Sequence, residues 1–392
     1  MRIKYIDGMR GLAVLMVLFS HLIVAFYPVL YPAPSLSNYS LNELLEQPLL
    51  VKIFVFTPLN IIYNGPFAVS VFLLISGYVL SYNCFHNKDE NYIASCFFKR
   101  YFRLTIPILF SCFISYFLLK FNAFNNLNAL NSRWMSQFFS CDANFFDMIK
   151  FALYDQYFGS SGLSVCYNPI LWMIPSLLFG SYLIYAFCAL FARSGSRLKI
   201  FFYIALVIIF SKTIFLSMIL GMILCDMDAN KIFQNVNKYV LLIMLLPGIY
   251  LGSFIRPDLP FYTIFNTHFM NNYFDNWISL LYFCYNIGAM ILFFVLSRLS
   301  FSIKIFSNKF VLYLGKISFS MYLLHFILIC SLSTYVYAWL MRNSIIASYD
   351  LSFLITLAIT IIVTIPLSHL FYKYVELRSL NISKLLYEFI NR

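Results

Sequence analysis

A succession of apolar runs, several of them long enough to cross a membrane as helices, constrains the fold of this chain more than any other feature. The runs lie at residues 9–30, 66–84, 103–120, 168–192, 239–254, 279–297, 310–340 and 351–373. Hydrophobic residues make up 62% of the chain and charged residues only 11%, whereas soluble domains carry about 25% charged residues. We therefore predict an all-α polytopic integral membrane protein with no soluble domain attached.

The charges between the apolar runs predict the orientation of the chain. When the N-terminus is placed in the cytoplasm, the cytoplasmic segments carry 18 Lys and Arg residues and the external loops carry six, as the positive-inside rule requires. This bias holds only if 193–199 and 226–238 lie on the same side of the membrane. The apolar region 200–225 must then cross twice or form a re-entrant hairpin with Lys212 at its tip.

These assignments predict about ten transmembrane helices around a buried polar cavity, with both termini in the cytoplasm. The membrane domain would cover 1–373, followed by a cytoplasmic tail at 374–392. The net charge of +12 belongs to the loops, so it does not indicate nucleic-acid binding. The nine Cys residues show no metal-ligand spacing, and we predict no metal site. The external loop 121–167 carries Cys141 and Cys166, which form either a disulfide or two free thiols.

The first apolar run carries two ionisable residues, Arg10 and His21. They are eleven positions apart, which is close to three helical turns, so both side chains share one face about 16 Å apart along the axis. Ionisable groups within a membrane are costly and usually functional. The alternative is that His21 only bonds to a neighbouring helix, as polar residues in membrane bundles often do.

A second histidine strengthens the functional interpretation of the first. His325 lies nine residues after Lys316, which we expect at the cytoplasmic end of its helix. That spacing places His325 at nearly the same depth as His21. Imidazole is the side chain most easily used for proton transfer near neutral pH, so we predict a buried polar site containing both histidines.

Two further motifs have both a functional and a structural interpretation. Lys99, Arg100 and Arg103 stand at the cytoplasmic start of the third run, where Arg100 and Arg103 share a helix face and can grip a phosphate. A basic cluster at this position also serves as a topology signal. Ser76 and Gly77 in the second run are either a polar wall of the cavity or a site of close helix packing.

Five segments, taken in order, resemble the membrane acyltransferase-3 family over nearly the full chain. They are YIDGMRG at the start, Arg10 followed by His21, ISGY at 75–78, Arg100-x-x-Arg103, and LGKISFSMYLLH at 314–325. The resemblance implies an enzyme of the bacterial inner membrane that transfers an acyl group, usually acetyl from acetyl-CoA, to a hydroxyl of a surface glycan. O-antigen, capsule, exopolysaccharide, lipopolysaccharide and lipid-linked precursors are the acceptors that it suggests.

The resemblance also assigns roles to individual residues. It makes Arg10 and His21 the essential pair of the first helix and His325 a further catalytic residue. It associates Arg100 and Arg103 with CoA binding, with Lys99 beside them. It makes Asp7, Ser76 and Gly77 supporting residues, Asp7 as a residue that caps or orients Arg10, and it matches Gly221 and Asp226 to another family segment. Tyr322 is a further supporting residue because it lies one turn before His325.

Two departures from the family pattern leave the acceptor undetermined. Many relatives have a Glu shortly after the Leu-Trp of the fourth helix, where this chain has Ser176 and Leu177. The last helix keeps Glu376 but lacks the Pro that often follows the next residue. The fold expected from the resemblance is unaffected by either difference.

The spacing and the resemblance together suggest a mechanism. Arg100, Arg103 and Arg10 would hold the CoA phosphates, and the pantetheine arm would run along the first helix towards His21. His21 would act as a general base on the acceptor hydroxyl or carry the acetyl group as an acyl-imidazole, and the sequence leaves both open. Tyr322 would donate a hydrogen bond to the thioester oxygen.

Two other classes of membrane protein compete with this interpretation. A transporter or flippase for a glycan intermediate would also contain buried ionisable residues, but the chain shows no inverted repeat. A glycan polymerase would leave Arg100 and Arg103 without a task. Binding or hydrolysis of acetyl-CoA in detergent distinguishes an acyltransferase from both.

Overall fold

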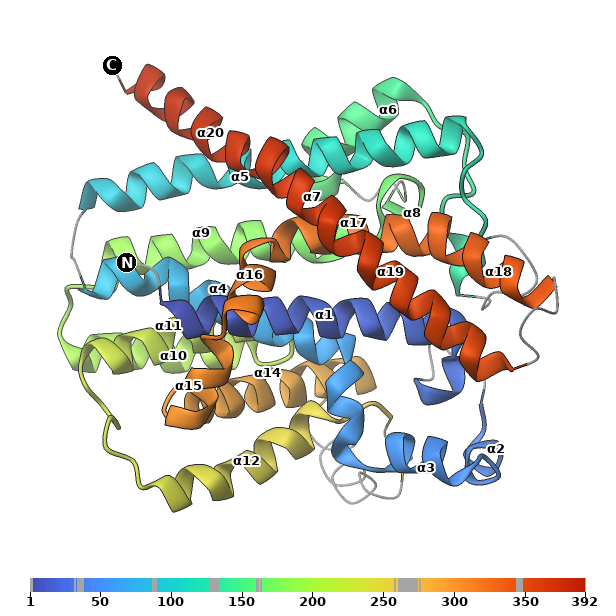
Figure 1. Cartoon of the computed structure of the whole chain (residues 1–392). Coiled ribbons are helices and arrows are strands. Elements are labelled where there is room, and N and C mark those ends of the chain that lie inside the picture. Colours follow the sequence, from blue (N-terminus) through green and yellow to red (C-terminus); the bar gives the residue numbers. More distant parts are fainter. Residues whose placement is uncertain are drawn as a thin grey trace. The chain divides into compact units, whose positions relative to one another are not determined.

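The computed structural model describes residues 3–31, 33, 39–86, 90–126, 134–159, 162, 164–256, 259, 274, 276–342 and 348–391. Every regular element in these ranges is a helix (Figure 1). The chain divides into two compact units. Unit 1 comprises Met1–Val17, Val29–Phe97 and Ser176–Lys316, and unit 2 comprises Leu18–Pro28, Phe98–Pro175 and Ile317–Arg392. Most of the predicted external loop 254–278 lies outside the described residues.

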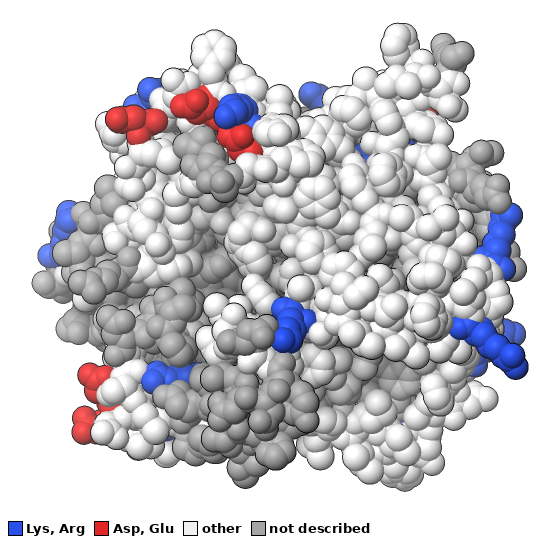
Figure 2. Space-filling model, turned by 180° about the vertical axis from the view of Figure 1, so that it is seen from behind, with Lys and Arg blue, Asp and Glu red and all other residues white. Residues whose placement is uncertain are grey.

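Seven helices in the described ranges are long and apolar enough to cross a membrane, so the chain is an integral membrane protein. They are Lys4–Phe26, Gly65–His86, Tyr92–Lys120, Pro169–Phe191, Trp277–Leu296, Ser318–Arg342 and Tyr349–Ile390. Figure 2 shows wide uncharged areas between the Lys and Arg side chains on one face of the molecule, as contact with lipid requires.

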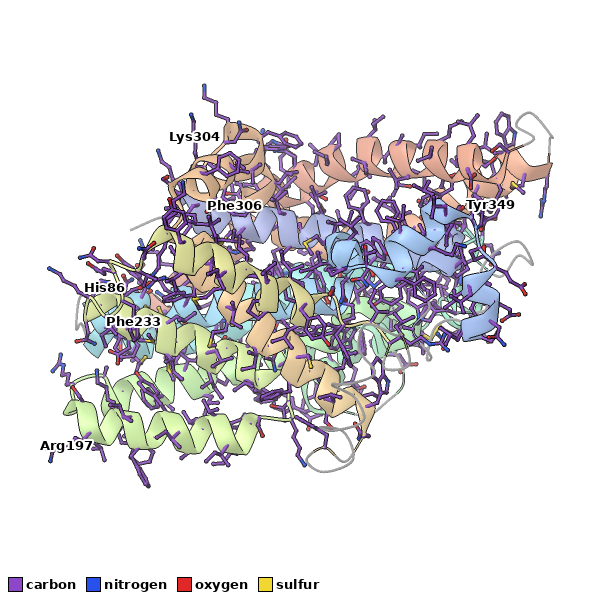
Figure 3. The ribbon with its side chains drawn as sticks, turned by 90° about the horizontal axis from the view of Figure 1, so that it is seen from below. His86, Arg197, Phe233, Lys304, Phe306 and Tyr349 are labelled. Atoms are coloured by element: carbon purple, nitrogen blue, oxygen red, sulfur yellow. A yellow bond between two sulfur atoms is a disulfide. The ribbon has the colours of Figure 1, made fainter. Side chains whose placement is uncertain are left out.

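The region predicted to cross twice forms a helical hairpin in unit 1. Helices α10 (Ser196–Phe210) and α11 (Phe215–Ala229) have 15 residues each, and Lys212 lies in the turn between them. Both helices are shorter than a full span of about 20 residues, so the prediction of about ten spans stays a prediction. In Figure 3, Arg197 and Phe233 lie towards the same end of unit 1. These residues belong to segments 193–199 and 226–238, which the charge count places on the same side of the membrane.

The other helices of unit 1 precede and follow this hairpin in the chain. They are α2 (Leu41–Leu45), α3 (Leu49–Phe56), α4 (Gly65–His86), α9 (Ile174–Phe191), α12 (Lys238–Gly252), α14 (Trp277–Leu296), α15 (Ser300–Phe306) and α16 (Lys309–Lys316). Helices α4 and α11 are in backbone contact, because a Cβ atom added to Gly77 would lie 2.0 Å from the Met218 carbonyl oxygen. A Cβ added to Gly221 would likewise lie 2.0 Å from the carbonyl oxygen of Leu74. Glycine therefore sets the distance between these two helices.

Unit 2 is built on the long helix α5 (Glu90–Lys120), whose first residues belong to unit 1. Its other helices are α6 (Phe145–Lys150), α7 (Gln156–Phe158), α8 (Ser164–Tyr167), α17 (Ser318–Leu328), α18 (Thr334–Arg342), α19 (Tyr349–Phe371) and α20 (Leu377–Ile390). The buried Asn168 side chain donates to Ser111 Oγ at 3.2 Å and to the Leu323 carbonyl at 3.1 Å, which joins α5, α17 and the segment before α9. Ser320 of α17 donates to the Glu376 carboxylate at 2.6 Å.

Several helix boundaries differ from those expected. Helix α1 runs from Lys4 to Phe26, so Asp7 lies in its first turn rather than before it. The run 310–340 is interrupted at Ile317, between α16 and α17. A short π-helical segment joins α19 to α20, so the predicted tail 374–392 continues the last membrane helix up to Ile390. Polar residues inside these helices interrupt or end the apolar runs, so the runs alone did not predict these boundaries.

Candidate functional site

The two histidines predicted at similar depth are in contact within unit 2. His21 Nδ1 lies 2.8 Å from His325 Nε2, and His325 has no exposed surface. The ring centroids are 5.0 Å apart and the ring planes differ by 7°. That separation is close to the N–N distance plus two ring radii, so the imidazoles meet edge to edge in nearly one plane. This is the geometry of a direct hydrogen bond between two rings.

The backbone of α17 fixes which nitrogen of each neutral ring carries a proton. His325 Nδ1 lies 2.7 Å from the Tyr322 carbonyl oxygen and 3.1 Å from that of Met321. A carbonyl oxygen only accepts, so His325 Nδ1 is protonated and His325 Nε2 is an acceptor. His21 Nδ1 must then donate to it, which leaves His21 Nε2 with a free lone pair. The pair therefore presents one basic nitrogen, on His21.

Aromatic rings enclose this pair. The Trp134 ring lies 5.7 Å from the His21 ring with an angle of 24° between their planes. Phe326 meets His21 edge to face at 5.2 Å and meets Trp134 at 5.4 Å. Our sequence reasoning missed Trp134, for which the only available signal was a tryptophan within the predicted external loop. The position of this ring depends on how the loop folds back over the helices.

Several bonds hold the loop that carries Trp134. The Asn126 side-chain amide donates to the carbonyl oxygens of Met135 at 2.8 Å and Phe138 at 2.6 Å. The Phe139 N–H donates to the Val165 carbonyl at 2.8 Å. Two residues further along, Cys141 is bonded to Cys166, with their Cα atoms 5.8 Å apart. Of the two alternatives open for these cysteines, the structure has the disulfide.

Tyr322 is buried beside the histidines but points its hydroxyl elsewhere. Its ring lies 5.8 Å from that of His325, and its hydroxyl donates to the carbonyl oxygen of Ile170. The bond holds α17 to the segment before α9. To donate to a thioester oxygen, as predicted, Tyr322 would have to give up this bond.

Arg10 and Asp7 form an ion pair in unit 1. The two side chains are 3.5 Å apart across one helical turn, and 27% and 13% of them are exposed, respectively. They line a cavity of about 190 Å³ together with two tyrosines, an asparagine and three aliphatic residues. These are Tyr82, Tyr92, Asn83, Ile3, Ile6 and Val79. The cavity has both polar and apolar walls and is large enough for part of an extended ligand.

The basic cluster of α5 lies in unit 2. Lys99 and Arg100 are half-buried and Arg103 is exposed. Lys99 Nζ lies 5.5 Å from the centroid of the Tyr387 ring of α20. The Phe98 ring contacts the same tyrosine at 5.7 Å. Helix α20 is therefore packed against the segment that we predict to bind phosphate. Arg10 belongs to the other unit.

The Ser76–Gly77 motif of unit 1 has mainly a packing role in the structure. Gly77 brings α4 into contact with α11, as described above. Ser76 Oγ donates to the Phe72 carbonyl of its own helix at 2.9 Å. That bond satisfies the hydroxyl within the helix, so the structural interpretation accounts for both residues.

Our sequence reasoning also missed a buried ionic cluster in unit 1. Lys199 Nζ lies 2.9 Å and 3.0 Å from the two carboxylate oxygens of Asp226. Tyr203 donates to Asp226 Oδ2 at 3.0 Å, and Asn230 donates to Oδ1 at the same distance. Asp226 is the family-motif residue of α11, and its position explains why an acid is needed there. The Asp226 carboxylate neutralises the charge of Lys199, of which only 8% is exposed to solvent.

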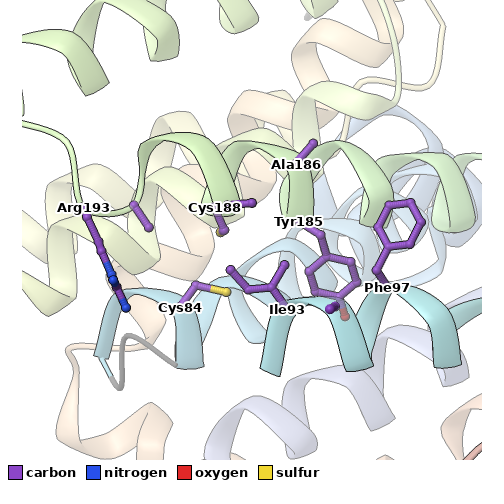
Figure 4. Close-up of a pocket in the computed structure, with 10 residues that line it drawn as sticks. Cys84, Ile93, Phe97, Tyr185, Ala186, Cys188 and Arg193 are labelled. Atoms are coloured by element: carbon purple, nitrogen blue, oxygen red, sulfur yellow. The ribbon is translucent and has the colours of Figure 1, made fainter. Parts of the chain in front are cut away.

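A second cavity of unit 1, of about 620 Å³, contains none of the predicted site residues. Figure 4 shows Cys84, Cys188, Tyr185 and Phe97 along it and Arg193 at one end. Alanines of α9 leave the space open. Within the part of the chain that the structure describes, no three His, Cys, Asp or Glu side chains gather as ligands for a metal ion.

The fold and the site define a helical membrane protein that holds a part-buried pair of imidazoles. A family model described as an acyltransferase domain, Acyl_transf_3, matches residues 3–373. The chain therefore belongs to the membrane acyltransferase-3 family, as the motifs predicted. No curated protein and no solved structure gives a significant match to the chain.

Proposed function

We propose that this protein transfers an acetyl group from acetyl-CoA to a hydroxyl of a cell-surface glycan or a lipid-linked sugar at the bacterial inner membrane. Membership of the acyltransferase family supports the reaction class. The observation that carries the proposal is the hydrogen bond of 2.8 Å from His21 Nδ1 to His325 Nε2. That bond gives His21 a single basic nitrogen and a fixed ring orientation, which proton transfer requires.

In the proposed reaction, the acceptor hydroxyl oxygen attacks the thioester carbonyl carbon while His21 Nε2 takes the hydroxyl proton. The carbon–sulfur bond then breaks, and the CoA sulfur leaves as a thiolate that recovers the proton from the imidazolium. His325 acts through His21, because its Nε2 accepts from His21 Nδ1 and stabilises the positive charge that develops on that ring. A route through an acetyl group on His21 Nε2 uses the same nitrogen.

The cations have separate proposed tasks in donor binding. Arg100 and Arg103 share one face of α5, where two guanidiniums can hold the phosphates of CoA by paired hydrogen bonds. Lys99 adds charge next to them. Arg10, held by Asp7, lines a cavity with polar and apolar walls. This cavity suits an amide or hydroxyl group of the donor better than a bare anion, because the Asp7 carboxylate is present as well.

The proposal is tested by release of the CoA thiol from acetyl-CoA, measured on purified protein in detergent. We expect His21→Ala to lower the rate at least about 100-fold, the usual contribution of a general base. The matched control is His86→Ala, because His86 is an exposed histidine bonded to the Tyr82 carbonyl of its own helix. Wild-type protein that neither binds nor cleaves acetyl-CoA would exclude the proposal and favour a transporter or polymerase.

A further inference from the structure

One ring beside the histidine pair differs from the residues around it. Met135, Phe138 and Phe139 follow Trp134 and are buried, with 0%, 8% and 3% of their surfaces exposed. Trp134 itself is only half-buried. The three buried residues anchor the loop, whereas Trp134 leaves part of a large aromatic surface open next to His21. A partly exposed indole beside a reactive group can contact a ligand, and tryptophan is enriched at binding surfaces for this reason.

The loop holds this surface in a fixed position. Phe124 and Phe139 stack at 4.0 Å with an angle of 7°, and the Asn125 N–H donates to the Cys330 carbonyl of the segment after α17 at 3.1 Å. The Cys141–Cys166 disulfide closes the loop on its other side. Because that segment directly continues α17, which carries His325, the loop is tied to the part of the chain that holds this imidazole. A preorganised surface loses little conformational entropy when a ligand binds.

The chemistry of the acceptor matches such a surface. A pyranose ring has faces of C–H bonds that pack against an aromatic ring, while its hydroxyls stay at the rim and reach hydrogen-bonding groups. Indole offers a broad apolar face together with one N–H donor. The Trp134 and His21 ring centroids are 5.7 Å apart, which is too close for a sugar to lie between the two rings. The sugar would rest on the open part of the indole and direct a ring hydroxyl towards His21.

We infer that Trp134 is the platform on which the acceptor sugar stacks, and that it makes the enzyme prefer cyclic sugars over other hydroxyl compounds. The inference rests on the proposed function and adds the residue that selects the acceptor. It also explains the disulfide, which keeps the platform in register with His21.

The test compares two acceptors that offer hydroxyl groups with and without a ring. Purified protein in detergent receives acetyl-CoA and either methyl α-glucopyranoside or the acyclic polyol mannitol, and acetylated product is measured by mass spectrometry. We expect Trp134→Ala to lower the ratio of pyranoside to mannitol acetylation about tenfold, as the loss of one aromatic contact predicts. Trp134→Phe should keep most of the preference, because it retains a stacking face.

The matched control is Trp172→Ala, which removes a 46% exposed tryptophan of unit 2 and should leave the ratio unchanged. An equal loss of both products in Trp134→Ala would overturn the inference, because it would mean that the ring only shields the site or holds the loop. An unchanged ratio would also overturn it. Wild-type protein that cleaves acetyl-CoA without preferring the pyranoside refutes the inference alone, whereas no cleavage at all refutes the proposed function with it.

Discussion

Each unit of this protein buries a polar pair, and the two pairs are completed differently. In unit 1, both oxygens of the Asp226 carboxylate are occupied by Lys199 and by one further donor each. In unit 2, three of the four nitrogens of the two histidine rings form hydrogen bonds. His325 Nδ1 donates to the backbone and His325 Nε2 accepts from His21 Nδ1, whereas His21 Nε2 keeps its lone pair. A closed pair can only stabilise the fold, whereas an open pair can exchange a proton with a substrate.

A second acid of unit 1 repeats the closed pattern. Asp228 accepts from the Tyr78 hydroxyl at 3.0 Å and from the Arg298 guanidinium at 2.6 Å. Arg298 also donates to the Phe233 carbonyl at 3.2 Å, and its guanidinium lies 3.8 Å from the centroid of the Phe294 ring. These contacts join α4, α11 and the end of α14. Asp226 and Asp228 are therefore each paired with a cation and with further donors, which is the usual condition for keeping ions out of water.

The largest effect that we expect comes from opening the closed pair. Asp226→Ala leaves the Lys199 ammonium without its counter-charge, and breaking a buried pair in this way costs about 3–5 kcal/mol. Thermal unfolding in detergent should show a clearly lower midpoint for this variant. The double variant Lys199→Met with Asp226→Leu removes both charges and should recover most of the loss. An Asp226→Ala protein as stable as the wild type would break the comparison.

The next effect concerns the open pair and appears in activity rather than in stability. His325→Leu removes the acceptor that fixes the His21 tautomer, and we expect about a 100-fold loss of acetyl transfer. His325→Gln keeps an acceptor oxygen for His21 and a donor for the α17 carbonyls, so it should retain more activity than the leucine variant. Activity and its pH profile, measured beside thermal unfolding, check this order. Full activity in the leucine variant would mean that His325 serves only to fill space, and equal losses in both variants would mean that the acceptor atom is not what matters.

A smaller loss of stability is expected where glycine sets a helix contact. Gly77→Ala places a methyl group 2.0 Å from the Met218 carbonyl oxygen, and overpacking of this kind costs about 1–3 kcal/mol. The matched control is Gly195→Ala, because nothing lies within 4 Å of the Cβ position there. Unfolding midpoints of the two variants should separate. Coincident midpoints would show that α4 and α11 can move apart freely.

The smallest effect sharpens the comparison at the surface of unit 2. Arg100→Ala and Arg103→Ala should each raise the KM for acetyl-CoA about tenfold and leave kcat nearly unchanged, since a charge-assisted hydrogen bond to a phosphate is lost. Arg197→Ala, an exposed arginine of unit 1, is the control. The increase should shrink at high salt because exposed charges are screened. An unchanged KM in both variants would remove the donor-binding role.

Much of the site was predictable because helices impose fixed spacings. The depth of His21 and the depth of His325 each followed from counting residues along a helix, and the two side chains are in contact. The pairing of Asp226 with Lys199 could not be counted in this way, since 27 positions separate them and a turn intervenes. Trp134 was beyond prediction for a related reason, because it sits on a loop whose course is set by the disulfide and by Asn126.

The sequence by itself determined that this is a helical membrane protein of the acyltransferase-3 family, because apolar length and motif order are properties of the chain alone. The sequence also identified His21 and His325 as the candidate catalytic histidines. Only the tertiary structure decided which nitrogen of His21 is basic, since that depends on two carbonyl oxygens of α17 lying within hydrogen-bond distance of His325. The bond that passes this choice on to His21 forms only when α1 and α17 pack together, and residue spacing along the chain does not encode that contact.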